Sequence, residues 1–545
     1  MQAPAETQGV DAARVPRSPA ANDGRRRSPS GTVRKVQLGM AGLVALTFFS
    51  VTGGPFGQEL IIKAGGARGA ICGLLALTVI WSVPEALMTA ELSSAFPEAA
   101  GFAAWSNAAF GPFAAWTDSW CSWVSGVVDN AVYPLLMLNY LEEVMAEGIT
   151  DEPWERWTFL MGFTCALTYL CYRGLDLTGR GALLLAFFIL MPFLTMAVLA
   201  IPIIEPSRWL VGRSDHDGTI RIRPWLNLLF WNVNYYDSAS AFAGETSRTG
   251  WGPSMMYSMM LCTASGLIPM LAATGASPKK YSDYHNGSYV GIARKIGGTW
   301  LARWVVVAAA CAYIGLFLSE MSSDAYQLMG MAERGLLPAC LAHRSKKYGT
   351  PTYAILLSAI GVVALHSLNF ETIIAVENLL YVVSMMIELS AWIKLRATRP
   401  DLKRTFQAPC GVAGLVFMVV PAMGLLVIIA VIQPIKVWAI AGGLAALGFF
   451  FYALVGRSRR SKHSPAYHVL GAEWASHSGI GAFCGWNDRL LDHPLALPEF
   501  AGDTFFTEED HLLCSRVQRP HGDDAMTENL LHAAQSDAEA VISTR

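Results

Sequence analysis

Seven acidic side chains stand inside stretches of this sequence that are otherwise apolar: Glu85, Asp129, Asp237, Glu320, Asp324, Glu377 and Glu388. A carboxylate that faces lipid at the centre of a membrane costs about 2.5 kcal/mol or more, so each is expected to line a cavity or to find a partner. Basic residues are scarce in the same stretches. This excess of acids suits a cationic substrate, a proton relay or both. The structural alternative is that the acids cap broken helix ends or bond Ser and Trp side chains.

The spacing of these acids brings some of them together. Glu320 and Asp324 are four residues apart, so they share one face of a helix. Asp129 shares a helix face with Gly126 and Tyr133. Carboxylates grouped in this way are suited to hold an ammonium group in an apolar interior.

Aromatic side chains supply a second kind of contact for an organic amine. An ammonium group over an aromatic ring gains about 0.5 to 2 kcal/mol. Trp231, Tyr235 and Tyr236 lie close to Asp237, and we assign Trp231 to a binding pocket. A second group forms a stripe on one helix, where packing or a membrane-interface belt is the favoured interpretation: Trp116, Trp120 and Trp123.

Two segments of membrane length are interrupted near their middle by residues that a continuous helix avoids. The first, residues 36–62, contains Gly53, Gly54, Pro55, Phe56 and Gly57, and the second, residues 224–244, contains the run from Trp231 through Asn234 and Tyr235 to Asp237. Irregular backbone at membrane depth survives only where it lines a cavity or binds something. Half-helix N-termini there favour an anion and bare carbonyls a cation, as in secondary transporters. For the first segment alone, the alternative is a Pro kink in a packed helix.

The elements that position these residues are membrane helices. The chain has 545 residues, of which 53% are apolar and only 15% charged, a composition that indicates a polytopic membrane protein and excludes an ordinary soluble enzyme. Apolar stretches of bilayer length predict twelve spans, near 38–62, 70–95, 111–141, 155–172, 181–203, 224–243, 252–275, 301–331, 351–368, 372–394, 411–432 and 435–455.

Two polar tails flank this region. Residues 1–35 form a basic tail expected to be disordered, and residues 456–545 a polar tail without a catalytic motif. Basic residues concentrate in loops that share a side with both tails, so we expect both termini in the cytoplasm and the protein in the plasma membrane. The ten cysteines are scattered without metal-binding spacing, and we expect no metal, no cofactor and no nucleic-acid partner.

Several short stretches together resemble the amino acid, polyamine and organocation transporter superfamily. Those that carry the resemblance are residues 53–57, 81–87, 90–92, 109–113, 129–131, 229–232 and 237–240. Two more specific stretches, residues 320–338 and 399–406, resemble the plant and protozoan polyamine uptake transporters of the L-type amino acid transporter branch. The resemblance covers about residues 36–455.

That resemblance implies an all-α membrane fold. Twelve transmembrane helices would form an inverted five-plus-five repeat with broken helices 1 and 6, followed by two additional helices. Repeat one would cover about 36–203, repeat two about 224–394, and helices 11 and 12 about 411–455. Substrate would lie between the two breaks.

We assign substrate binding to residues on both breaks and on helices three and eight, namely Gly53, Gly54, Pro55, Phe56, Gly57, Asp129, Trp231, Asn234, Tyr235 and Glu320. Glu320 stands where the arginine-exchanging branch places a substrate-contacting Trp, and a carboxylate there suits an ammonium group. We assign coupling or gating to Asp237, Asp324 and Glu59. Asp237 stands where related exchangers place a Glu that senses protons or substrate.

We therefore predict a secondary transporter, and not an enzyme, that imports polyamines such as putrescine or spermidine by alternating access with protons. Residues 181–202 lack the Lys that some proton-driven relatives carry, which leaves the coupling ion open. An amino acid permease or exchanger is the alternative, and a non-transporting nutrient receptor a remote one. Residues 142–154 contain no Cys, so we expect no covalent heavy-chain partner.

Overall fold

The computed structural model describes residues 39–98, 101–143, 152–174, 180–213, 218–246, 248–334 and 336–462. Within these ranges the secondary structure is helical and contains no β-strand. The predicted tail 1–35 lies outside the described residues, as does the chain from 463 onward, which is most of the predicted tail 456–545.

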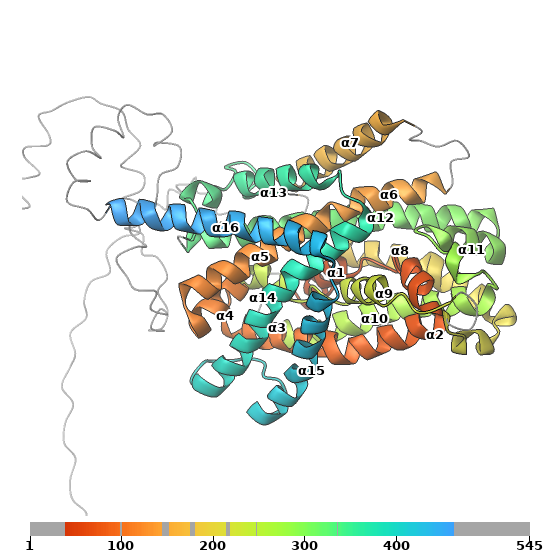
Figure 1. Ribbon diagram of the computed structural model, residues 1–545, viewed down its shortest axis with the longest axis horizontal. Coiled ribbons are helices and arrows are strands. Elements are labelled where there is room, and N and C mark those ends of the chain that lie inside the picture. The colour runs from red at the N-terminus through yellow and green to blue at the C-terminus, as the bar shows by residue number, and fades with distance from the viewer. Residues whose placement is uncertain are drawn as a thin grey trace, which may run out of the picture. The chain divides into compact units, whose positions relative to one another are not determined.

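The α-helices form a long series joined by short turns and 3-10 segments (Figure 1). Their bounds are α1 Met40–Val51, α2 Glu59–Leu77, α3 Val83–Ala95, α4 Gly101–Phe110, α5 Pro112–Asn130, α6 Val132–Glu142, α7 Pro153–Tyr172, α8 Arg180–Ala200, α9 Ile222–Trp231, α10 Trp251–Ala276, α11 Ser288–Gly297, α12 Thr299–Glu333, α13 Thr352–Leu365, α14 Phe370–Thr398, α15 Val412–Val431 and α16 Ile435–Lys462.

Eight helical stretches in the described part of the chain are long and apolar enough to cross a membrane. They run over Glu59–Ala95, Pro112–Glu142, Gly181–Ile203, Trp251–Ala276, Thr299–Glu333, Phe370–Thr398, Val412–Val431 and Ile435–Ala453. Two shorter apolar helices are α1 and α13. Helices of this length satisfy their own backbone hydrogen bonds in lipid, so the chain is a multi-pass integral membrane protein.

The first break separates α1 from α2. Three glycines in it have positive φ, namely Gly53 (54°), Gly54 (134°) and Gly57 (77°), a region that side-chain-bearing residues rarely enter. Gly53 N–H still donates to Phe48 O (2.8 Å), which closes the last turn of α1. Farther on, α2 is kinked at Gly66, whose φ is 72° and where an added Cβ would lie 2.4 Å from the Arg213 backbone nitrogen.

The second break begins where α9 ends at Trp231. A 3-10 helix from Asp237 to Glu245 resumes the path. Between them Tyr235 has φ 72°, and it is the one non-glycine residue with positive φ in the described part of the chain. An aromatic residue in that region is strained, so neighbouring contacts must hold it.

The helices that carry the acids pack against one another. α5 packs along α14 and also along α12, while α1 contacts α10, α8 and α12 (Figure 1). Their facing side chains are buried, as are Asp129, Glu320 and Glu377. The interior between α1, α5, α12 and α14 therefore holds carboxylates within an apolar core.

Three features go beyond the sequence prediction. A π-helical turn, Thr78–Ser82, joins α2 to α3, and short helices α4 and α11 occupy segments without a predicted span.

The stripe of Trp116, Trp120 and Trp123 is buried, and the Trp120 indole donates to Leu444 O (3.1 Å) on α16. The structure thus supports packing as the role of this stripe.

Candidate functional site

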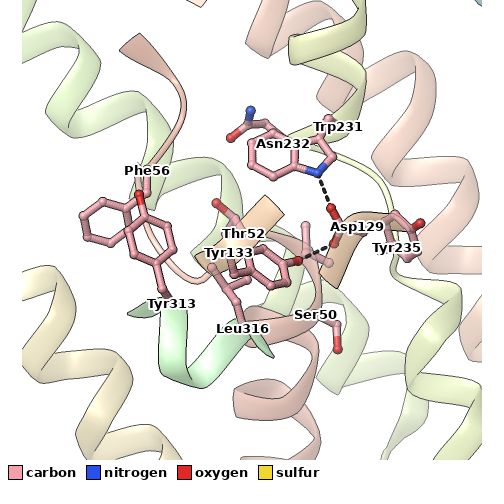
Figure 2. A pocket seen from close by; sticks show the side chains of 11 residues that line it. Ser50, Thr52, Phe56, Asp129, Tyr133, Trp231, Asn232, Tyr235, Tyr313 and Leu316 are labelled. Atoms are coloured by element: carbon pink, nitrogen blue, oxygen red, sulfur yellow. Dashed lines mark hydrogen bonds between the residues drawn. The ribbon is translucent and has the colours of Figure 1, made fainter. Parts of the chain in front are cut away.

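A small cavity lies between the two breaks. Its walls come from α1, the first break, α5, α6, the second break and α12. The lining residues are Ser50, Val51, Thr52, Phe56, Asp129, Tyr133, Trp231, Asn232, Tyr235, Tyr313 and Leu316, and Figure 2 shows the Trp231 indole and the Tyr133 hydroxyl directed at Asp129. The space that a water centre can reach is about 10 Å³, which is room for about one water molecule. The cavity is thus occluded and too small for an organic substrate.

Asp129 is the charged side chain in this wall. Its Oδ1 accepts a hydrogen bond from Trp231 Nε1 (2.6 Å) and its Oδ2 one from the Tyr133 hydroxyl, as Figure 2 shows. Tyr133 stands one helical turn along the same face, as the spacing predicts. An ionised carboxylate has about four acceptor positions, so both oxygens retain capacity for an ammonium group.

The two breaks touch each other at this cavity. A Cβ at Gly57 would lie 2.8 Å from the Trp231 ring, and one at Gly53 would lie 2.6 Å from the Leu316 side chain. Distances below 3.0 Å are not tolerated without movement, so glycine is required for the close approach as well as for the positive φ. The first break forms one wall of the cavity and Trp231 the opposite wall.

Glu320 and Asp324 lie beside the cavity wall without lining it. Both pack on the backbone of α5, where a Cβ at Gly126 would lie 2.2 Å from Asp324 Oδ1 and 2.8 Å from Glu320 Oε1. Glu320 interacts electrostatically with Asp324, Asp129 and Glu377. Glu320 Oε2 and Asp324 Oδ2 are buried and have no hydrogen-bond partner among the described residues.

Asn234 connects the second break to another carboxylate. Its amide donates to Glu377 Oε1 on α14 at 3.4 Å, and Glu377 Oε2 has no hydrogen-bond partner in the described part of the chain. Glu377 is fully buried and interacts electrostatically with Asp129 and Tyr235. Asn234, which we assign to substrate binding, thus contacts Glu377, an acid to which the sequence analysis gives no specific role.

Asp237 belongs to a hydrogen-bonded group behind the second break. The Tyr381 hydroxyl contacts Asp237 Oδ1 and also Glu85 Oε1 (2.9 Å). It further accepts from the Tyr235 N–H (3.2 Å), and the two tyrosine rings stack with centroids 4.5 Å apart. Glu85 Oε1 accepts from the Tyr236 N–H (2.6 Å), which caps the broken helix. One hydroxyl therefore links two carboxylates and holds the strained Tyr235 in place.

Glu59 lies elsewhere. Its Oε1 accepts hydrogen bonds from the Tyr140 hydroxyl and from Gly287 N–H (3.1 Å), which ties the start of α2 to the turn before α11. It does not line the cavity. Its assignment to coupling or gating stays a prediction.

Of the residues assigned to binding, Phe56, Asp129, Trp231 and Tyr235 line the cavity. The first-break glycines lie in the adjoining backbone, while Asn234 and Glu320 stand behind the wall. Sequence reasoning missed Tyr313, Ser50 and Thr52 in the wall and Tyr381 behind it. Tyr381 follows Glu377 by four residues on one face of α14, but this spacing does not indicate which carboxylates its hydroxyl contacts.

Apolar spanning helices, two broken segments meeting at an occluded cavity and buried acids around it define a membrane transport protein. The comparisons with known proteins agree. The amino acid permease family matches residues 42–467, and the chain belongs to this family. Its members are transporters and not enzymes.

Three relatives are similar over most of their length. A probable polyamine transporter of Arabidopsis thaliana is 43% identical over 420 residues, covering 76% of this chain and 86% of the relative. Polyamine transporter PUT1 of Oryza sativa subsp. japonica is 43% identical over 414 residues, covering 75% and 77%. Polyamine transporter RMV1 of Arabidopsis thaliana is 41% identical over 427 residues, covering 77% and 86%.

Proposed function

We propose that this protein imports polyamines such as putrescine and spermidine across the plasma membrane by alternating access, with protons as the coupling ion. The fold proposed for this is the twelve-helix inverted repeat with both termini in the cytoplasm. The single observation that carries the substrate proposal is the cavity wall. Among the described residues that line it, Asp129 is the charged one, and Phe56, Tyr133, Trp231, Tyr235 and Tyr313 supply aromatic rings.

The arrangement of the other acids favours a substrate with more than one ammonium group. Asp129 on α5, Glu320 on α12 and Glu377 on α14 stand on three helices around the breaks, and the last two keep buried oxygens without a described hydrogen-bond partner. Leaving a buried carboxylate without a counter-charge is costly. A chain with ammonium groups along its length meets this demand, and an amine with a single charge does not.

Proton coupling is supported by the group formed by Glu85, Asp237 and Tyr381. A phenol has one hydrogen, so it donates to one carboxylate at a time. Tyr381 contacts both Glu85 and Asp237, and both contacts are hydrogen bonds only when one of the two acids carries a proton. The geometry thus favours one proton held at this position, directly behind the backbone of the second break.

Alternating access is supported by the size of the cavity. About 10 Å³ of water-centre space admits no polyamine, so binding requires the breaks to separate. Gly57 and Trp231 form a close contact between the two breaks, and this contact must open for the breaks to separate. The structure thus corresponds to an occluded conformation in the transport cycle that we propose.

An amino acid permease or exchanger is the second candidate, and one observation favours it. In the first break, the N–H groups of Gly54, Phe56 and Gly57 donate to no described residue. Free N–H groups at a broken helix suit an α-carboxylate. The chain is also more distantly similar to the arginine/ornithine antiporter of Latilactobacillus sakei, with 20% identity over 338 residues.

Uptake of labelled spermidine and labelled leucine into transporter-deficient cells separates the two candidates. We expect spermidine uptake to exceed leucine uptake, and Glu320→Gln to reduce the former. Leucine uptake above spermidine uptake, unchanged by Glu320→Gln, would overturn the polyamine proposal.

The same cells test proton coupling. A protonophore is expected to abolish concentrative spermidine uptake by the wild type, and Asp237→Asn to make the remaining flux insensitive to it. If the protonophore does not change wild-type spermidine uptake at low external sodium, proton symport is excluded. The substrate proposal is not affected by that result.

A further inference from the structure

A groove between α7 and α13 lies outside the transport site. Its volume is about 620 Å³, and its walls are mainly apolar, with Met161, Cys165, Leu356, Ile360 and Val363 among them. Ile360 is 66% exposed and Leu356 51%. The two helices pack side by side at the edge of the bundle (Figure 1).

The groove has the length of one lipid leaflet. From Met161 to Tyr172 the wall on α7 rises by about 16 Å at 1.5 Å per residue. Half of a hydrocarbon core of about 30 Å is about 15 Å. An acyl chain that runs alongside α7 therefore fits the groove from end to end.

One end of the groove carries positive charge. The Arg173 guanidinium bonds the Tyr169 hydroxyl (3.0 Å) and lies 5.1 Å from the Tyr348 ring centroid, while Lys347 Nζ lies 5.2 Å from the same ring. Both cations are exposed, and no described acidic residue forms an ion pair with them. Tyr169 and Tyr172 also line the groove, so the charges stand at its mouth.

We propose that this groove binds one anionic phospholipid, with an acyl chain between α7 and α13 and the phosphate at Arg173 and Lys347. The charge fits the leaflet: basic loops mark the cytoplasmic side, where anionic lipids reside. Two cations at the surface correspond to about a 30-fold preference for an anionic over a zwitterionic headgroup. The site links the lipid leaflet to α13, which packs against α12 and α5.

Native mass spectrometry of the full chain, released from nanodiscs of equal phosphatidylserine and phosphatidylcholine, tests the proposal. The wild type is expected to retain phosphatidylserine, and Ile360→Trp, which fills the groove, to lose bound lipid of both kinds. Arg173→Gln with Lys347→Gln is expected to remove the preference and retain binding. The controls are Leu184→Trp, at an exposed position of α8, and Arg294→Gln with Lys295→Gln on α11.

Equal retention of both lipids by the wild type would overturn the proposal, because the groove then holds only bulk lipid. So would loss of preference in the α11 control pair to the same degree. A wild-type dimer that Ile360→Trp converts to a monomer would assign the groove to a second copy of this chain instead.

Discussion

The two broken segments accommodate irregular backbone at membrane depth in different ways. The first break relies on glycine, with positive φ at Gly53, Gly54 and Gly57, and several of its N–H groups have no described partner. The second break contains a strained tyrosine, and side chains from other helices bind its backbone. Glu85 accepts from the amides of Tyr236 and Asp237, and Ser82 donates to Val233 O (2.9 Å).

This difference separates two roles. In the first break, the N–H groups of Gly54, Phe56 and Gly57 donate to no described residue, so they are available to a bound substrate in the mechanism that we propose. In the second break Glu85 and Ser82 bind the backbone, so this segment presents the side chains of Trp231 and Tyr235 to the cavity, and the proton that we propose would lie behind it. One segment is thus suited to shape and open the site, and the other to couple charge to that movement.

The largest expected effect is at the charged wall beside the second break. Asp129→Asn keeps acceptors for Trp231 and Tyr133 in part but removes the negative charge in the cavity. Truncating one partner of a buried charge pair costs 2 to 5 kcal/mol, so spermidine uptake at low concentration is expected to fall by about 100-fold. Initial-rate uptake measures this, with surface expression as the control. Full activity of Asp129→Asn would show that uptake does not need a negative charge beside Trp231.

Gly57→Ala tests the opening role of the first break. The added Cβ meets the Trp231 ring at 2.8 Å and requires a φ of 77°. We expect uptake to fall by about 30-fold. Gly111→Ala is the matched control, since Gly111 has φ 90° with nothing near its Cβ and so adds backbone strain alone. Equal losses in the two variants would show that closeness to Trp231 is irrelevant.

Glu85→Gln tests whether the second break couples protons. The amide oxygen still accepts from Tyr236 N–H and keeps the helix cap, but the side chain no longer exchanges a proton with Asp237. Uptake driven by an acidic external medium is expected to fall by about tenfold, with expression unchanged. Spermidine uptake measured across external pH checks this. A profile identical to the wild type would restrict Glu85 to capping.

The smallest expected effect is at the Tyr235 hydroxyl, which donates to Ser125 Oγ (3.0 Å). Tyr235→Phe keeps the ring stacked on Tyr381 and loses one neutral hydrogen bond, worth about 1 kcal/mol. Uptake is expected to fall by about fivefold. Tyr257→Phe, at an exposed position of α10, serves as control. A loss as large as that of Asp129→Asn would mean that this hydroxyl contacts the substrate.

The sequence predicted the parts of this site whose signals are local. Helix-breaking residues locate both breaks, and i, i+4 spacing places Tyr133 next to Asp129, as the structure shows. Contacts across helices lack such a signal. Nothing in the sequence near Tyr381 indicates that its hydroxyl reaches Glu85 and Asp237, because that contact depends on how α14 packs beside the second break.

The strained φ of Tyr235 was equally out of reach of sequence reasoning. An aromatic residue favours extended backbone, and only the stacking and hydrogen bonds supplied by α14 and α5 override that preference. Sequence distance also hid the position of Glu59, whose partner Gly287 lies far along the chain.

Asp129, Glu85 and Asp237 are held by hydroxyl, indole and backbone N–H donors, which carry no net charge. In the described part of the chain, no cation pairs with these three acids, so the return step of the carrier that we propose would move negative charge unless protons neutralised it. Each elementary charge that crosses 100 mV is worth about 2.3 kcal/mol. In such a carrier, membrane voltage would act on the substrate-free protein as well as on its substrate, and the resting potential of the cell would influence the rate of the return step.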